Sequence, residues 1–121
     1  MSEHLGIQVG NAQTDAAQRG WFVGGFIDEK FGLRHSNDVE MRWAIHPAGD
    51  ERAEWVTGET RTAICVLISG QVDFTFRNQS GEQQVTLAKQ GDFVMWGPGD
   101  DHTWRAPVDA VTMAVRWIAS K

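Results

Sequence analysis

The stretch Gly91–Arg105, GDFVMWGPGDDHTWR, decides the fold class. A strand-like segment, DFVMW, leads into a Gly-Pro-Gly turn, and a second short segment with His102 and Trp104 leaves it. Short segments of this kind, separated by glycine- and proline-rich turns, are typical of antiparallel strands. Several barrel folds use such a tight turn to direct a histidine into their interior, so His102 would either hold a metal, serve another chemistry or only fill space.

The same pattern extends over most of the chain. No segment shows a helical period over ten or more residues, whereas alternation of apolar and polar residues recurs from residue 39 onward. We expect strands at 21–27, 39–46, 61–68, 71–77, 84–88, 92–96, 102–106 and 109–119. We expect a loop at 28–38 and a turn at 46–52. About eight short strands with Gly-rich turns predict an all-β sandwich or barrel.

Length and composition limit the class of protein. The chain has 121 residues, of which 41% are apolar, enough for one domain with its own core. We expect a barrel domain at residues 21–121 and a flexible N-terminal arm at residues 1–20. The net charge of −5 argues against a nucleic-acid partner, and no apolar run is long enough for a membrane span. The single cysteine, Cys65, and the polar N-terminus favour a cytoplasmic protein.

Two stretches resemble the signature of the cupin superfamily. Its second motif, G-x(5)-P-x-G-x(2)-H-x(3)-N, matches Gly91, Gly99 and His102 in register, with Gly97 at the proline position and Ala106 at the asparagine position. Its first motif, G-x(5)-H-x-H-x(3,4)-E-x(6)-G, ends at Gly70. Ala63 then occupies the position of the glutamate ligand, and Thr57 and Glu59 occupy those of the two histidines.

The resemblance covers roughly residues 40–118 and implies a cupin-type jelly-roll β-barrel. The chain also looks like small stand-alone bacterial cupins that carry RGWFVG, W-x-x-H-P-x-G, LISG and WGPG-x-x-H-x-W. Small cupins commonly pair, so the resemblance implies a homodimer, for which the run at 21–27 offers an edge strand. The family's metal chemistry is not implied in full, because most of its ligand positions hold other residues.

The leading hypothesis is a metal-free site for a small organic acid, sugar or aromatic metabolite. If the chain is extended from residue 57, then Thr57, Glu59, Arg61, Ala63 and Cys65 share the inward face. Arg61 would bind a carboxylate, and His102 with Glu59 would carry acid–base chemistry. The predicted ligand-binding residues are Arg61, Trp104, Trp96, Trp55 and Thr57.

Two alternatives stay open. A metal-dependent enzyme would use His102, Glu59 and His46 to hold a divalent transition metal, although Arg61 beside Glu59 competes with a cation. A non-catalytic sensor or accessory protein would bind a metabolite without turnover. Glu59 and Arg61 can also be read as a structural ion pair. Cys65 is expected to be an inert core residue, and Trp21, Trp43 and Trp117 are expected in the core.

Overall fold

Two antiparallel sheets face each other in the protein, which we describe from a computed structural model over residues 6–118. Residues 1–5 of the predicted arm and the end of the last predicted strand lie outside the described residues. The strands are β1 (Trp21–Val23), β2 (Val39–His46), β3 (Glu51–Val56), β4 (Thr62–Ser69), β5 (Val72–Asn78), β6 (Gly81–Leu87), β7 (Phe93–Trp96), β8 (Asp101–Arg105) and β9 (Ala110–Trp117). Two 3₁₀ segments, η1 (Gln18–Gly20) and η2 (Glu29–Arg34), flank β1.

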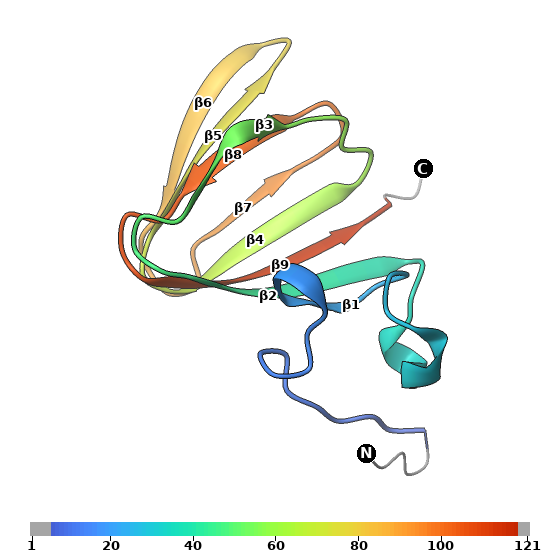
Figure 1. The fold of residues 1–121 in the computed structure, drawn as a ribbon. Helices are drawn as coiled ribbons and strands as arrows, with labels where there is room; N and C mark the ends of the chain where they lie inside the picture. The colour runs from blue at the N-terminus through green and yellow to red at the C-terminus, as the bar shows by residue number, and fades with distance from the viewer. Residues whose placement is uncertain (1–5, 119–121) are drawn as a thin grey trace.

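The strand order is that of a jelly roll. One sheet has the order β1-β2-β9-β4-β7, and the other has the order β3-β8-β5-β6. Strands β2 to β9 make the eight strands of a jelly roll, and β1 extends the first sheet beyond β2. The all-β jelly-roll prediction is therefore confirmed. The two sheets converge at one end and separate at the other (Figure 1).

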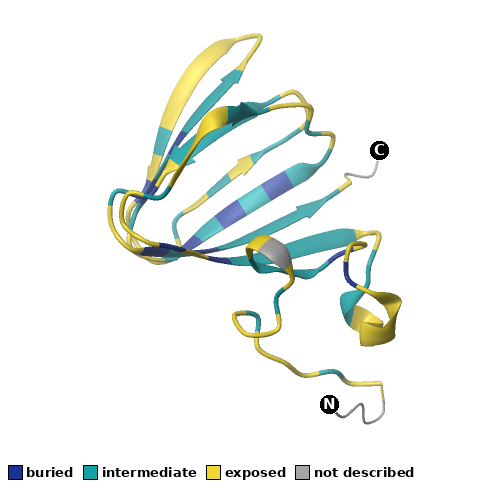
Figure 2. Cartoon of the chain, in the orientation of Figure 1, coloured by how far each residue is buried: buried dark blue, intermediate teal, exposed yellow. Residues whose placement is uncertain are grey.

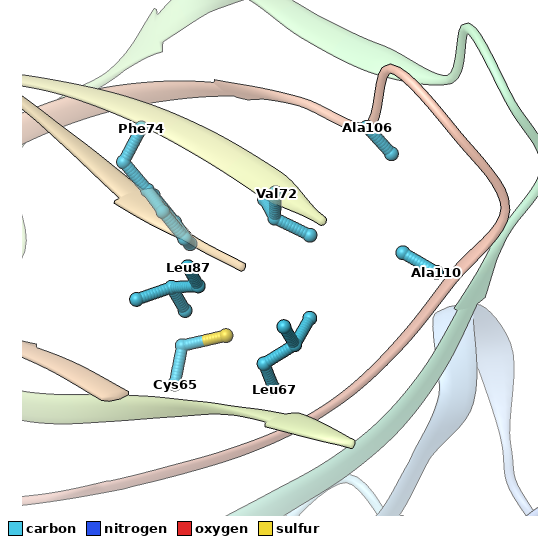
Figure 3. Packing of buried hydrophobic residues seen from close by; sticks show 7 residues of the cluster. All are labelled: Cys65, Leu67, Val72, Phe74, Leu87, Ala106 and Ala110. Atoms are coloured by element: carbon cyan, nitrogen blue, oxygen red, sulfur yellow. The ribbon is translucent and has the colours of Figure 1, made fainter. Parts of the chain in front are cut away.

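The core lies at the end where the sheets converge (Figures 2 and 3). Leu67 on β4, Val72 on β5 and Leu87 on β6 are almost completely buried. Cys65, Phe74, Ala106 and Ala110 complete the buried cluster. Gly70 joins β4 to β5 with a φ of 87°, and a Cβ there would lie 2.1 Å from the carbonyl oxygen of Asp109. The tight closure of this end therefore requires glycine at position 70.

The outer face of the five-stranded sheet is apolar. Alternation along β2 directs Ala44 and His46 inward, where both are buried, and directs Trp43 outward. Trp43 pairs with Met113 of β9, and Trp117 pairs with Val39 on the same outer face. The prediction that Trp43 and Trp117 lie in the core is therefore wrong. Side chains on this outer face cover one another and leave Ile45, Phe93 and Met95 exposed.

The predicted strands agree with the structure except near β1 and β3. Strand β1 ends at Val23 because Gly24 adopts a φ of 156° and turns the chain. The predicted loop at 28–38 contains η2, whose first turn is capped by the Asp28 side chain. The segment 51–56, read partly as a turn, forms edge strand β3, whose first four residues are exposed. Strand β4 begins at Thr62, so residues 57–61 form a loop.

Residues 6–20 run beside the β1–β2 edge, and side-chain hydrogen bonds hold them there. The side chain of Gln8 bonds to the backbone of Phe31 and Leu33. Arg34 donates to the carbonyl oxygen of Asp15, and Arg42 donates to that of Arg19. No helix within residues 6–118 is long and apolar enough to cross a membrane.

Candidate functional site

A cavity of about 210 Å³ lies between the two sheets, and we call it the cup. The five-stranded sheet contributes residues of β1, β2, β9, β4 and β7 to its wall, and the four-stranded sheet contributes residues of β3, β8 and β5. Inward-facing positions alternate along each strand, so Ala63 and Cys65 on β4 face Phe74 on β5. Small side chains at Ala63 and Ala114 leave this volume free.

His102 reaches the cup from the start of β8, directly after the Gly-Pro-Gly turn. The amide of Gly97 donates to the Asp100 carboxylate, and Gly99 takes a φ of 89°, so the turn is closed before the strand begins. The His102 ring lies 4.8 Å from the Trp96 ring and 5.9 Å from the Phe76 ring, measured between centroids. Burial among these rings, and then the charge of Arg52, lower the pKa of His102 from 6.5 to about 4.

The Nδ1 atom of His102 is buried, and no residue of the described chain forms a hydrogen bond with it. The same holds for Nε1 of Trp96. Buried polar atoms without partners are uncommon and costly in folded proteins. Both residues line the cup, so this wall presents two unused hydrogen-bonding atoms.

Aromatic rings form much of the remaining wall. Trp21, Trp96 and Trp104 all line the cup, with Phe74 between the two sheets. Trp104 packs on the His46 ring at 4.5 Å, and the Arg116 guanidinium lies 4.0 Å from the Trp21 ring centroid. The prediction placed Trp96 and Trp104 on the wall, and the structure places both there. Trp21 lines the cup as well, although the sequence pattern assigned it to the core.

Glu59 and Arg61 form a four-residue ion-pair cluster with Glu40 and Arg116 at the edge of the cup. The Arg61 Nε donates to Glu59 Oε2 at 2.9 Å, and Arg61 also pairs with Glu40. Arg116 pairs with Glu40 and lies 3.7 Å from Glu59 Oε1. Burial acts to raise the pKa of Glu59, but hydrogen bonds from the Arg61 side chain and backbone outweigh it and keep that pKa below its ordinary value. Glu59 is therefore a paired carboxylate at neutral pH.

Three of the predicted ligand-binding residues lie outside the cup wall. Gly58 has a φ of 74°, which breaks the extended chain assumed from residue 57, and Thr57 is exposed. Arg61 is bound to its two carboxylates and is not among the lining residues. Trp55 stacks instead against Arg77, whose guanidinium lies 4.0 Å from its ring centroid.

The guanidinium groups on the wall belong to other arginines, which the sequence reasoning missed. The wall contains four arginines and a single glutamate, Glu59, so its formal charge is +3 within a chain of net charge −5. The arginines are Arg19, Arg42, Arg52 and Arg116. A signal was present in the sequence, since Arg42 shares a strand face with His46, but that face was not recognised as the inward one.

A wider cleft of about 850 Å³ adjoins the cup between the N-terminal residues and the β2–β3 side of the molecule. Arg19, Arg42 and Arg52 line both spaces, as do His46 and Trp104. His46 is buried, and its Nδ1 lies 2.9 Å from Asp50 Oδ2. Because these residues are shared, the cleft and the cup lie next to each other.

The donor set of the cup does not suit a divalent metal. His102, Glu59 and His46 all line the cup, but Glu59 is held by Arg61 and His46 contacts Asp50. Ala63, at the position of the family's glutamate ligand, has no donor atom. Among residues 6–118, no group of three or more His, Cys, Asp or Glu side chains is arranged to hold a metal ion.

Cys65 lies deeper in the cup, in the buried cluster of Figure 3. Burial raises the pKa of its thiol to about 11, against smaller opposing contributions from Thr112 and Arg42. The thiol is therefore protonated at neutral pH and is a poor nucleophile.

Comparison with known proteins supports the fold and leaves the activity open. Neither a protein-family profile nor a curated protein sequence matches the chain. A cupin superfamily protein from Desulfitobacterium hafniense is similar in structure, with a TM-score of 0.59 and 16% identity over 72% of this chain and 73% of that chain. The Cnp3 cupin domain of Schizosaccharomyces pombe has a TM-score of 0.58 and 11% identity over 70% of this chain and 56% of that one.

HppE, solved with cobalt(II) and its substrate, has a TM-score of 0.54 and 12% identity over 66% of this chain and 45% of that one. The chain thus spans less than two thirds of the length of both the Cnp3 domain and HppE. HppE, which was solved with cobalt(II), and the Cnp3 cupin domain both have folds similar to this one. The fold alone therefore does not define one activity. The chain has a jelly-roll fold that is similar to that of solved cupin structures.

Proposed function

We propose that the protein binds a small, flat organic molecule in the cup, without a metal ion. The observation that carries this proposal is the cup itself, a partly open space between the sheets lined by three indole rings and by His102 with an unpartnered Nδ1. Concave sites with apolar aromatic walls and a few directed polar atoms are typical of small-molecule sites. Flat rings on the wall favour a ligand with a flat face.

In this proposal His102 is the group that exchanges a hydrogen bond or a proton with the ligand. Its lowered pKa keeps the ring neutral at pH 7, so it can donate from one nitrogen and accept at the other. Glu59, predicted as its catalytic partner, acts as a positioning residue, because its carboxylate holds Arg61 and lies beside Arg116. Trp96 and Trp104 form the flat walls.

A cavity-filling variant tests the proposal. Ala114 lines the cup, and Ala114→Leu adds three carbons to the free volume. Met113 is its neighbour on β9 and, by strand alternation, faces the outer side, so Met113→Leu is the matched control. Ligand-observed NMR with a library of small aromatic and aliphatic compounds measures binding to each protein.

We expect compounds that bind the wild-type protein and Met113→Leu to lose at least about tenfold in affinity for Ala114→Leu, because the ligand and the new side chain compete for the same space. Far-UV circular dichroism checks that both variants fold. Equal binding by folded Ala114→Leu would place the ligand outside the cup and would contradict the proposal.

A further inference from the structure

Within residues 6–118, Arg42 has no carboxylate counterion; Arg19 and Arg52 on the same wall also lack one, but they are exposed, whereas Arg42 is half-buried. Its Nε donates to the backbone carbonyl of Arg19, which holds the side chain beside both the cup and the cleft. Among residues 6–118, no carboxylate lies within ion-pairing distance of its guanidinium. Arg61, Arg77 and Arg116 each pair with at least one carboxylate.

The surroundings of Arg42 oppose its charge. Burial is the largest cause of its lowered pKa; Cys65 opposes this decrease, the nearby charges of Arg19 and Arg116 add to it, and Asp50 opposes it slightly. A partly buried cation without a partner is unfavourable, and an anion placed against it recovers that energy. The cup wall has a formal charge of +3, which favours an anion once it lies inside the cup.

The chemistry of the Arg42 guanidinium favours a planar anion as its partner. A guanidinium presents parallel N–H donors that match the two oxygens of a carboxylate. The Trp21 ring centroid lies 5.8 Å from the Arg42 Cζ, so an indole face stands beside the charged group. Trp104, which also lines both spaces, offers a second flat surface. A carboxylate attached to a flat apolar body satisfies the cation and the aromatic wall together.

We propose that Arg42 is the anion-binding residue of the cup and that the ligand is a flat organic acid whose carboxylate it binds, an inference that rests on the proposed function. It assigns to Arg42 the role that the sequence pattern assigned to Arg61. The neutral His102 ring then faces the body of the acid, and Arg52 and Arg19 line both the cup and the cleft.

The test compares benzoate with benzamide, which have nearly the same shape and differ in charge. Isothermal titration calorimetry and ligand-observed NMR measure both probes on the wild-type protein, on Arg42→Gln and on Arg105→Gln. Arg105 is exposed, does not line the cup, and gives the same change in net charge, so its variant is the matched control. Arg42→Lys keeps the charge and removes the paired donors, which gives a second variant if Arg42→Gln does not fold.

We expect the wild-type protein and Arg105→Gln to bind benzoate at least about tenfold more tightly than benzamide, and Arg42→Gln to lose that preference. Arg42→Lys should retain only part of it. Added sodium chloride should weaken benzoate binding and leave benzamide binding unchanged. The preference of the wild-type protein for benzoate over benzamide tests the anion site even if no variant folds.

Three results would overturn the inference, and they separate it from the proposed function. Equal binding of both probes to the wild-type protein would refute the anion site and leave the cup as a binding site. A preference for benzoate that survives in folded Arg42→Gln would move the anion site to another arginine. Failure of both probes to bind would contradict the anion site. The proposed function would also be contradicted only if no library compound distinguished Ala114→Leu from Met113→Leu.

Discussion

Replacing His102 with phenylalanine should remove a specific loss of stability at acid pH. The wild-type ring is neutral in the folded protein until the pH approaches about 4, whereas in the unfolded chain it takes up a proton near its ordinary pKa of 6.5. Since the unfolded state binds the proton first, the free energy of unfolding falls as the pH decreases between these two values. A phenyl ring cannot titrate, so the His102→Phe protein lacks this part of the fall.

The magnitude follows from the two pKa values. A decrease from 6.5 to about 4 corresponds to about 3 kcal/mol for a fully desolvated ring. The ring is partly exposed, so screening by water reduces the expected contribution to about 2 kcal/mol. His102→Phe also removes the unpartnered Nδ1 from a site surrounded by Trp96, Phe74 and Phe76, so the variant should be at least as stable as the wild-type protein at neutral pH.

Urea denaturation followed by tryptophan fluorescence, at a series of pH values, measures the difference between the two proteins. Paired carboxylates such as Glu59 also lose their charge in acid, but they do so in both proteins, and the difference isolates His102. Proton NMR of the imidazole gives its pKa directly, and Arg52→Gln should raise that pKa because Arg52 is the second cause of its decrease. Parallel stability curves, or a His102 pKa near 6.5, would refute the argument from burial.

Two further predictions concern metal and assembly. Protein purified without a tag or metal column should contain far less than one transition-metal ion per chain by plasma mass spectrometry. The reason is that Glu59 and His46, the donors near His102, already contact Arg61 and Asp50. Near-stoichiometric metal that is lost in His102→Ala would contradict this prediction. If the expected homodimer forms through the apolar outer face of the five-stranded sheet, Phe93→Lys should shift the sedimentation coefficient from dimer to monomer, since Phe93 is 59% exposed on that face. A shift seen only in Val23→Lys would instead place the contact at the β1 edge, and a wild-type protein that is monomeric at all concentrations would contradict both.

The strands were predictable where apolar and polar residues alternate. The continuous apolar run also predicted β4, but as a strand buried on both faces, whereas buried Ala63, Cys65 and Leu67 alternate with half-buried Ile64 and Val66. Strand β3, with the sequence ERAEWV, was missed because it lies at a sheet edge and its charged residues have no apolar face to contrast with. The alternation of apolar and polar residues indicates which residues are buried. An exposed edge strand such as β3 buries few residues and therefore shows little alternation.

The site was less predictable because alternation groups residues by face without saying which face is inward. On β2, Met41, Trp43 and Ile45 share the outer face, although Trp43 was expected in the core. The alternation correctly puts Arg42 and His46 on one face of β2. That face was not recognised as the inward one, which lines the cup. The alternation of inward and outward residues could not be extended across Gly58. Its positive φ interrupts the extended chain that would have directed Arg61 inward.

The charge of the cup and the departures from the cupin motifs agree with each other. A cupin metal site gathers neutral and anionic donors around a cation, and the resemblance would require a glutamate at the position of Ala63 and histidines at the positions of Thr57 and Glu59. Here Ala63 leaves open space, and the remaining carboxylate is bound to Arg61. Four arginines surround that space, so a divalent cation would be repelled where an anion is attracted. Under our proposal the space between the sheets favours an anion over a cation, and for this reason we propose a flat organic acid at Arg42, and not a metal ion, as its ligand.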